Sequence, residues 1–133
     1  MVTKNPEERG KGSRKIETLA GTTNLMPSFA DNLDSLPKVD HIERIELQHR
    51  GGSLGGVIEN KPGQQGSLAV YHYLQQTFGL IDSQAASRGL ELYAEHTVDA
   101  RVNPGKHPNI DRLLRVVEGG LPLSVRIIPR AAT

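Results

Sequence analysis

The spacing of hydrophobic side chains predicts short helices separated by turns. Apolar residues that recur every three or four positions indicate a helix with one buried face. One short helix is expected over residues 83–88, where Asp82 can cap its start and Gly89 can end it. The helices predicted by apolar spacing run from a first turn at Pro27 to the stop at Pro37, from Leu68 to Phe78, and from Pro108 to the Gly119–Gly120 pair.

Hydrophobic and polar residues alternate in other segments, which is typical of strands buried on one face. The predicted strands are 41–49, 57–59, 90–96 and 123–128. The order of elements is therefore α-β-β-α-α-β-α-β, which predicts an α+β fold with a single small sheet of about four strands and helices packed mainly on one face. Residues 25–133 are expected to form this one domain. Residues 1–24 lack an apolar period and are predicted to be a disordered tail.

Glycine and proline mark the turns between these elements. Four glycines lie within residues 51–56, and we interpret them as a β-hairpin turn with a bulge. Their spacing matches neither of the common glycine-rich phosphate loops, so a phosphate loop is not favoured. Two Pro-Gly turns, at 61–64 and 103–106, each lead to a predicted helix start, capped by Ser67 and beginning near Pro108.

Composition narrows the classes of function. The 133-residue chain has a formal net charge of +1, so it offers no basic surface for nucleic acid, and we expect no nucleic-acid partner. The absence of cysteine excludes disulfides and thiolate metal sites. The chain shows neither a signal-peptide pattern nor the apolar run of roughly 18 residues that a membrane span needs. We therefore expect a cytoplasmic protein of bacterial type with no membrane partner.

The segment from Glu95 to Asp111 concentrates more groups able to bind ligands or move protons than any other part of the chain. It is expected to link a strand to a helix and to fold into a shared pocket. Because helix N-termini attract anions, we interpret the helix start at 106–111 as a site for a small anionic or polar ligand, with no cofactor. The predicted ligand-binding residues are Arg101, Lys106, His107 and Asn109, joined by Lys61 and Ser67 if both Pro-Gly turns lie on the same rim of the sheet.

The same segment leaves other interpretations open. A divalent metal ion would make the protein a metal-assisted hydrolase. Metal-free acid–base catalysis would instead pair His96 with Asp99 or Glu95, although no motif marks a nucleophile. A homodimer formed through an uncovered sheet face or edge would make the protein an interaction domain. The ligands expected for the metal alternative are His96, Asp99, His107 and Asp111.

Three longer segments carry a recognisable pattern. They are F-A-D-N-L-D-S-L-P from Phe29 to Pro37, P-G-Q-Q-G-S-L-A-V-Y from Pro62 to Tyr71, and A-E-H-T-V-D-A-R-V-N-P-G-K-H-P-N-I-D-R-L-L from Ala94 to Leu114. Together they resemble a family of short bacterial proteins known only as a domain of unknown function. The resemblance covers roughly residues 29–117, most of the predicted domain. It implies a bacterial, cytosolic protein of one domain, and it assigns no catalytic residue.

Overall fold

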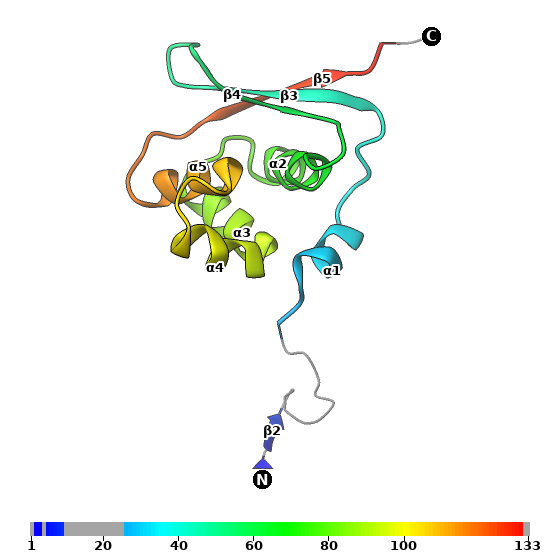
Figure 1. Cartoon of the computed structure of the whole chain (residues 1–133), viewed down its shortest axis with the longest axis vertical. Coiled ribbons are helices and arrows are strands. Elements are labelled where there is room, and N and C mark those ends of the chain that lie inside the picture. The colour runs from blue at the N-terminus through cyan, green and yellow to red at the C-terminus, as the bar shows by residue number, and fades with distance from the viewer. Residues whose placement is uncertain (1, 4, 10–25, 132–133) are drawn as a thin grey trace.

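The computed structural model describes residues 2–3, 5–9 and 26–131, which Figure 1 shows as coloured ribbon. The disordered tail predicted over residues 1–24 lies mostly outside these ranges. Within it the structure has two short strands that pair in parallel, β1 (Val2–Thr3) and β2 (Asn5–Arg9). The elements that form the domain lie within residues 26–131.

The sheet of the domain has three antiparallel strands in the order β4-β3-β5. In the central strand, Ile45 lies opposite Ile58 on one side and Ile127 on the other, so one face of the sheet is apolar. The β3–β4 pairing shifts between Leu47 and Gln48, which confirms the predicted hairpin with a bulge. The three strands are β3 (Ile42–Gln48), β4 (Leu54–Glu59) and β5 (Ser124–Pro129).

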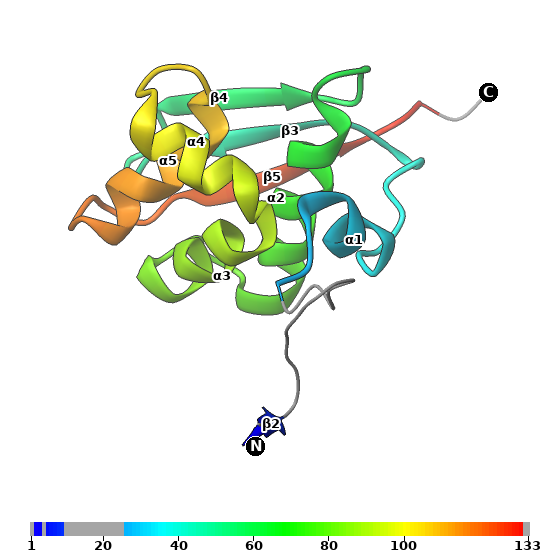
Figure 2. The ribbon, with the colours of Figure 1, turned by 60° about the horizontal axis from the view of Figure 1, so that its bottom comes forward.

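Five helices lie within residues 26–131, and Figures 1 and 2 show them on one side of the sheet. Helix α2 contacts all three strands, and its buried residues, with Tyr71 the largest, fill the space beneath them. No helix in the described part of the chain is both long and apolar enough to cross a lipid bilayer. The helices are α1 (Phe29–Asp34), α2 (Gln65–Phe78), α3 (Ser83–Tyr93), α4 (Glu95–Val102) and α5 (Pro108–Val117).

Two predicted helix caps have different outcomes. Asp82 Oδ1 accepts a hydrogen bond from Ala85 N at 2.9 Å, which confirms Asp82 as the cap of α3. The prediction that Ser67 caps α2 was wrong, because the helix already begins at Gln65. Ser67 Oγ instead accepts a hydrogen bond from the Tyr93 hydroxyl at 2.7 Å, so it joins α2 to α3.

The segment 90–96 is helical, so the prediction of a fourth strand was wrong. Gly89 does not end α3, which continues to Tyr93. Gly89 is buried, and a Cβ there would lie 2.7 Å from Leu113 Cδ1. The glycine therefore lets α3 and α5 approach closely. The alternation from Leu90 onward suits a strand, but the buried positions of α3 also fit helical spacing, and the tertiary contact with α5 favours the helix.

A single residue separates α3 from α4. Ala94 has a φ of +52°, a conformation that residues with a Cβ rarely adopt, and it turns the chain so that α4 begins at Glu95. The polar segment expected to link a strand to a helix is therefore largely a helix itself. Residues 103–107 alone connect α4 to α5.

Candidate functional site

Helix α5 carries polar side chains on both sides of its buried stripe. At about 100° per residue, His107 and Asp111 flank one side of the stripe and Asn109 and Arg112 flank the other. The first pair faces α4, and the second lies toward β4. The stripe itself consists of Ile110, Leu113 and Val116.

On the α4 side, four polar side chains form the Asp99 cluster. Asp99 Oδ2 lies 2.7 Å from His107 Nε2 and forms an ion pair with Lys106 Nζ at 2.9 Å. Asp99 Oδ1 accepts a hydrogen bond from Asn103 Nδ2 at 2.8 Å. One carboxylate thus holds several points of the loop that joins α4 to α5. The cluster consists of Asp99, Asn103, Lys106 and His107.

These contacts stabilise the ionised form of the carboxylate. Hydrogen bonds from His107, Lys106 and Asn103 hold the pKa of Asp99 well below its usual range. Asp99 is therefore charged at neutral pH, and it compensates the positive charge of Lys106. A neutral His107 that donates from Nε2 would keep Nδ1 as an acceptor, which is the geometry of an imidazole oriented by a carboxylate.

Aromatic rings extend this region toward α1. The ring centroid of His96 lies 5.7 Å from that of His107 and 5.1 Å from that of Phe29. Phe29 N also donates a hydrogen bond to Glu95 Oε1 at 2.9 Å. Neither Glu95 nor Asp99 is hydrogen-bonded to His96 among the described residues, so the acid–base pair expected for His96 does not form. The histidine that faces a carboxylate is His107.

On the β4 side, Arg112, Asn109 and Tyr71 form the Arg112 cluster. Arg112 Nη1 donates a hydrogen bond to Asn109 Oδ1 at 2.8 Å and lies 3.5 Å from the Tyr71 hydroxyl oxygen. That hydroxyl donates to the Asn109 backbone carbonyl at 2.5 Å. Burial raises the pKa of Tyr71 to about 12, against the opposing effect of the Arg112 charge. The hydroxyl therefore stays protonated at neutral pH and remains a donor.

Gly56 in β4 makes room for the guanidinium group of Arg112. A Cβ at position 56 would lie 2.5 Å from Arg112 Nη2 and 3.0 Å from Cζ, and the φ of Gly56 is +153°. The guanidinium therefore rests on the strand backbone, in the space that a side chain would otherwise fill. This contact gives one glycine of the run at 51–56 a role beyond the hairpin turn.

The charge of Arg112 has no carboxylate partner within residues 26–131. Arg112 is half-buried, and no Asp or Glu among the described residues forms an ion pair with it. Arg44 offers a comparison, because its side chain is 34% exposed and pairs with Glu43 at 2.9 Å and with Glu46 at 3.0 Å. A half-buried guanidinium is thus compensated on the sheet but not beside α5.

Half of the six predicted ligand-binding residues lie at the start of α5, but on its two sides. Arg101 is exposed on α4. Lys61 Nζ pairs with Glu59 Oε1 at 3.0 Å, and Figures 1 and 2 place the β4–α2 connection away from the α4–α5 connection, across the width of the domain. The two Pro-Gly turns are therefore not neighbours in the fold. The three residues at α5 are Lys106 and His107, in the Asp99 cluster, and Asn109, in the Arg112 cluster.

The four predicted metal ligands are also divided. Asp111 Oδ2 accepts a hydrogen bond from Gly105 N at 3.0 Å, which stabilises the loop before its own helix. His96 lies beside the ring of His107, whereas Asp99 contacts His107 directly. Within residues 26–131, no three or more His, Asp or Glu side chains are grouped so that they could hold a metal ion. The set therefore does not assemble around one point.

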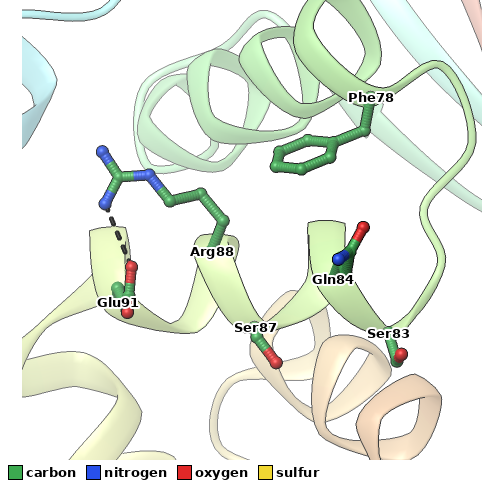
Figure 3. A pocket seen from close by; sticks show the side chains of 6 residues that line it. All are labelled: Phe78, Ser83, Gln84, Ser87, Arg88 and Glu91. Atoms are coloured by element: carbon green, nitrogen blue, oxygen red, sulfur yellow. Dashed lines mark hydrogen bonds and ion pairs between the residues drawn. The ribbon is translucent and has the colours of Figure 1, made fainter.

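A shallow groove lies between α2 and α3, and Figure 3 shows it from close by. Its volume is about 400 Å³. Arg88 pairs with Glu91 at 3.1 Å, and its guanidinium carbon lies 5.9 Å from the centroid of the Tyr73 ring, so its charge is already engaged. The groove offers a partly exposed aromatic ring and small polar groups. Its lining residues are Phe78, Ser83, Gln84, Ser87, Arg88 and Glu91.

Sequence reasoning named Asn109 but missed the other two members of the Arg112 cluster, Arg112 and Tyr71. Packing alone accounts for Tyr71 and the hairpin alone accounts for Gly56, so neither residue points to a site by itself. The spacing of Asn109 and Arg112, three positions apart on one helix, is the local signal that could have indicated a pair. Their contacts with α2 and β4 depend on the tertiary fold, which local patterns do not determine.

Comparison with known proteins identifies a family without assigning an activity. The model of the family described as an uncharacterized protein conserved in bacteria (DUF2322) matches residues 29–127. The matched range runs from the first residue of α1 into β5, so it contains both clusters beside α5. No curated protein and no solved structure matches the chain. The chain therefore belongs to this bacterial family, in agreement with the resemblance of its three sequence segments.

Proposed function

We propose that the protein is a small binding module for an anionic ligand and that Arg112 makes the principal contact with this ligand. The observation that supports the proposal is a half-buried guanidinium that has no carboxylate partner among the described residues. Withdrawing a charge from water is unfavourable unless a counter-charge or hydrogen bonds compensate it. A carboxylate or phosphate group of a ligand would supply the missing counter-charge.

The surroundings of Arg112 favour an anion. The charge of Arg115 acts on the same Tyr71 hydroxyl and lowers the pKa of Tyr71, so two guanidinium groups contribute to the local field. The side-chain oxygen of Asn109 is used by Arg112, which leaves the Asn109 amide nitrogen as a donor. A planar guanidinium can bind both oxygens of a carboxylate or phosphate through parallel hydrogen bonds. Together these groups supply charge and direction for an anionic group.

The Asp99 cluster is less suited to an anion. Lys106 and His107, which the sequence predicts as ligand-binding residues, both contact Asp99 Oδ2. An incoming anion would have to displace Asp99 or bind beside its negative charge, and like charges at close range repel. We therefore assign the ligand to the β4 side of α5 and give the Asp99 cluster a structural role in holding the α4–α5 loop.

Thermal unfolding in the presence of ligands tests this function. Wild-type protein would be heated with phosphate, with a set of mono- and dicarboxylates, and with nucleotides. A ligand present at 100 times its dissociation constant adds about 2.7 kcal/mol to stability, which is a readily measured rise in Tm. We expect Arg112→Gln to lose the response, and Arg112→Lys to keep only part of it, because an ammonium group cannot form the two parallel hydrogen bonds.

Arg126 provides the matched control, because it is an exposed arginine on β5. Arg126→Gln removes the same charge from the protein and should respond to the ligand as wild type does. An equal response in wild type and Arg112→Gln would contradict the proposal. So would the absence of any response across all the anions at about 50 mM, a concentration that reveals even weak sites with dissociation constants near 10 mM.

A further inference from the structure

We propose that His41 and His72 form a binding site for a divalent transition-metal ion that prefers imidazole ligands, with Zn²⁺ as the representative ion. The two rings lie 5.8 Å apart, centroid to centroid, with an angle of 77° between their planes. His72 comes from α2, and His41 directly precedes β3. The site is separate from the Arg112 cluster and from the histidines of the α4–α5 region.

His72 supplies the first observation that points to a missing group. The residue is 6% exposed, and its Nδ1 is buried with no hydrogen-bond partner among the described residues. Buried polar atoms in folded proteins are almost always paired with protein, water or an ion, so an unpaired one requires an explanation. The lone pair of an imidazole nitrogen is a preferred ligand of zinc, copper and nickel.

His41 supplies the second ring and gives access from solvent. Its residue is exposed, whereas its backbone is fixed, because Arg130 N donates a hydrogen bond to the His41 carbonyl at 2.9 Å. Two imidazoles that bind one tetrahedral ion at about 2.1 Å place their ring centroids roughly 5 Å apart. The observed centroid separation of 5.8 Å is close to this distance, and binding requires the exposed His41 ring to turn until one of its nitrogens and His72 Nδ1 face the same ion.

The protonation state of His72 also suits metal binding. A metal ion is bound by the neutral imidazole, whose unprotonated ring nitrogen donates its lone pair. No third His, Asp or Glu of the described residues completes a metal site here, so water would occupy the remaining positions. A site with two nitrogens and no carboxylate selects Zn²⁺ over Mg²⁺ or Ca²⁺, which prefer oxygen ligands.

Isothermal titration of the full chain with ZnCl₂ at pH 7.5 tests the site. We expect one ion to bind per chain, and His41→Ala to weaken binding at least tenfold. His41 is the better position for the variant, because the residue is exposed and its replacement leaves the core unchanged. His49→Ala is the matched control, since His49 is an exposed histidine at the other end of β3, and it should bind as wild type does. MgCl₂ should give no binding heat.

A double variant separates this site from the remaining histidines of the chain. The five histidines are at positions 41, 49, 72, 96 and 107. His96→Ala combined with His107→Ala should leave Zn²⁺ affinity within twofold of wild type. Loss of binding in that double variant, equal binding in His41→Ala and wild type, or no binding at millimolar Zn²⁺ would each overturn the proposal. The last result would mean that His41 and His72 pack only against each other and water.

Discussion

The two sides of α5 carry polar clusters that differ in how their charges are balanced. On the α4 side, Asp99 compensates Lys106 and faces His107, so this cluster is complete within the protein. On the β4 side, Arg112 is held by the neutral oxygens of Asn109 and Tyr71, and no carboxylate of the described chain compensates it. The comparison teaches that polar residues crowded along a sequence can balance one another in the fold, while an uncompensated charge lies just outside the most crowded segment.

The largest effect is expected at the point where the Arg112 cluster meets the sheet. In Gly56→Ala, the new Cβ would stand 2.5 Å from Arg112 Nη2, and the φ of +153° would be strained for alanine. We expect a loss of about 2–3 kcal/mol in the free energy of unfolding, measured by urea denaturation. The same change should abolish the response to an anionic ligand, because the guanidinium must move away.

Gly63→Ala separates backbone strain from crowding. Gly63 has a φ of +89°, but no atom lies within 4 Å of the position of its Cβ. This variant should lose about 1 kcal/mol and retain the response to the ligand. Equal losses of stability in the two variants would contradict the claim that the guanidinium occupies the space above Gly56.

A smaller loss is expected when the buried hydroxyl of the Arg112 cluster is removed. Tyr71→Phe removes the hydrogen bond from the hydroxyl to the Asn109 carbonyl and one of the two oxygen contacts of Arg112. We expect the free energy of unfolding to fall by about 1–2 kcal/mol. Tyr73→Phe is the control, because Tyr73 is only partly buried, and it should change stability by less than about 0.5 kcal/mol. Identical effects of the two changes would show that the hydroxyl of Tyr71 contributes nothing specific.

These effects depend on contacts, and only some of those contacts can be predicted from the sequence. The helices with strong apolar periodicity, the bulged hairpin and the cap at Asp82 were predictable, because each depends on neighbouring residues. The continuation of α3 past Gly89 was not predictable. Gly89 allows the close approach of Leu113 from α5, and this contact joins residues far apart in the sequence. Features that depend on contacts between distant helices and strands therefore could not be predicted from local sequence patterns.

In the candidate site, too, contacts between residues near in sequence were easier to predict than contacts between distant elements. Polar residues crowd together after Glu95 in the sequence, and in the fold Lys106 and His107 both contact Asp99, whereas the ligand pocket expected there stays a prediction. The Arg112 cluster needed the fold, since its parts come from α2, α5 and the backbone of β4. The sequence did not mark Arg112 as a site residue, because a single arginine on a helix is usually exposed.

The contribution of the Asp99 cluster to the stability of the folded protein should be lost at acidic pH. The pKa of Asp99 is lower in the folded protein than in the unfolded chain, so its stabilising effect is present above about pH 4 and is lost as the pH falls through the folded value. We expect the urea midpoint of wild type to fall more steeply below about pH 4 than that of Asp99→Asn. Parallel profiles of the two proteins would show that Asp99 gains no stability from its partners. The response to ligand at neutral pH should be the same in both.

The smallest effect is expected from Lys106→Gln. The Lys106 side chain is 59% exposed, and exposed ion pairs contribute less than about 1 kcal/mol. We expect a change in the free energy of unfolding of no more than about 0.5 kcal/mol and an unchanged response to an anionic ligand. If the response disappears in Lys106→Gln and persists in Arg112→Gln, the ligand belongs to the Asp99 cluster.

The most direct measurement observes Arg112 itself. In a ¹H–¹⁵N spectrum of the full chain, the side-chain Nε–H signal of Arg112 can be assigned by its loss in Arg112→Lys. On titration with phosphate or the best-binding carboxylate, the account predicts a saturable shift of this signal, while the Nε–H signals of Arg44 and Arg126 stay in place. An Arg112 signal that does not move while the protein binds the anion elsewhere, or equal shifts at all three arginines, would contradict it.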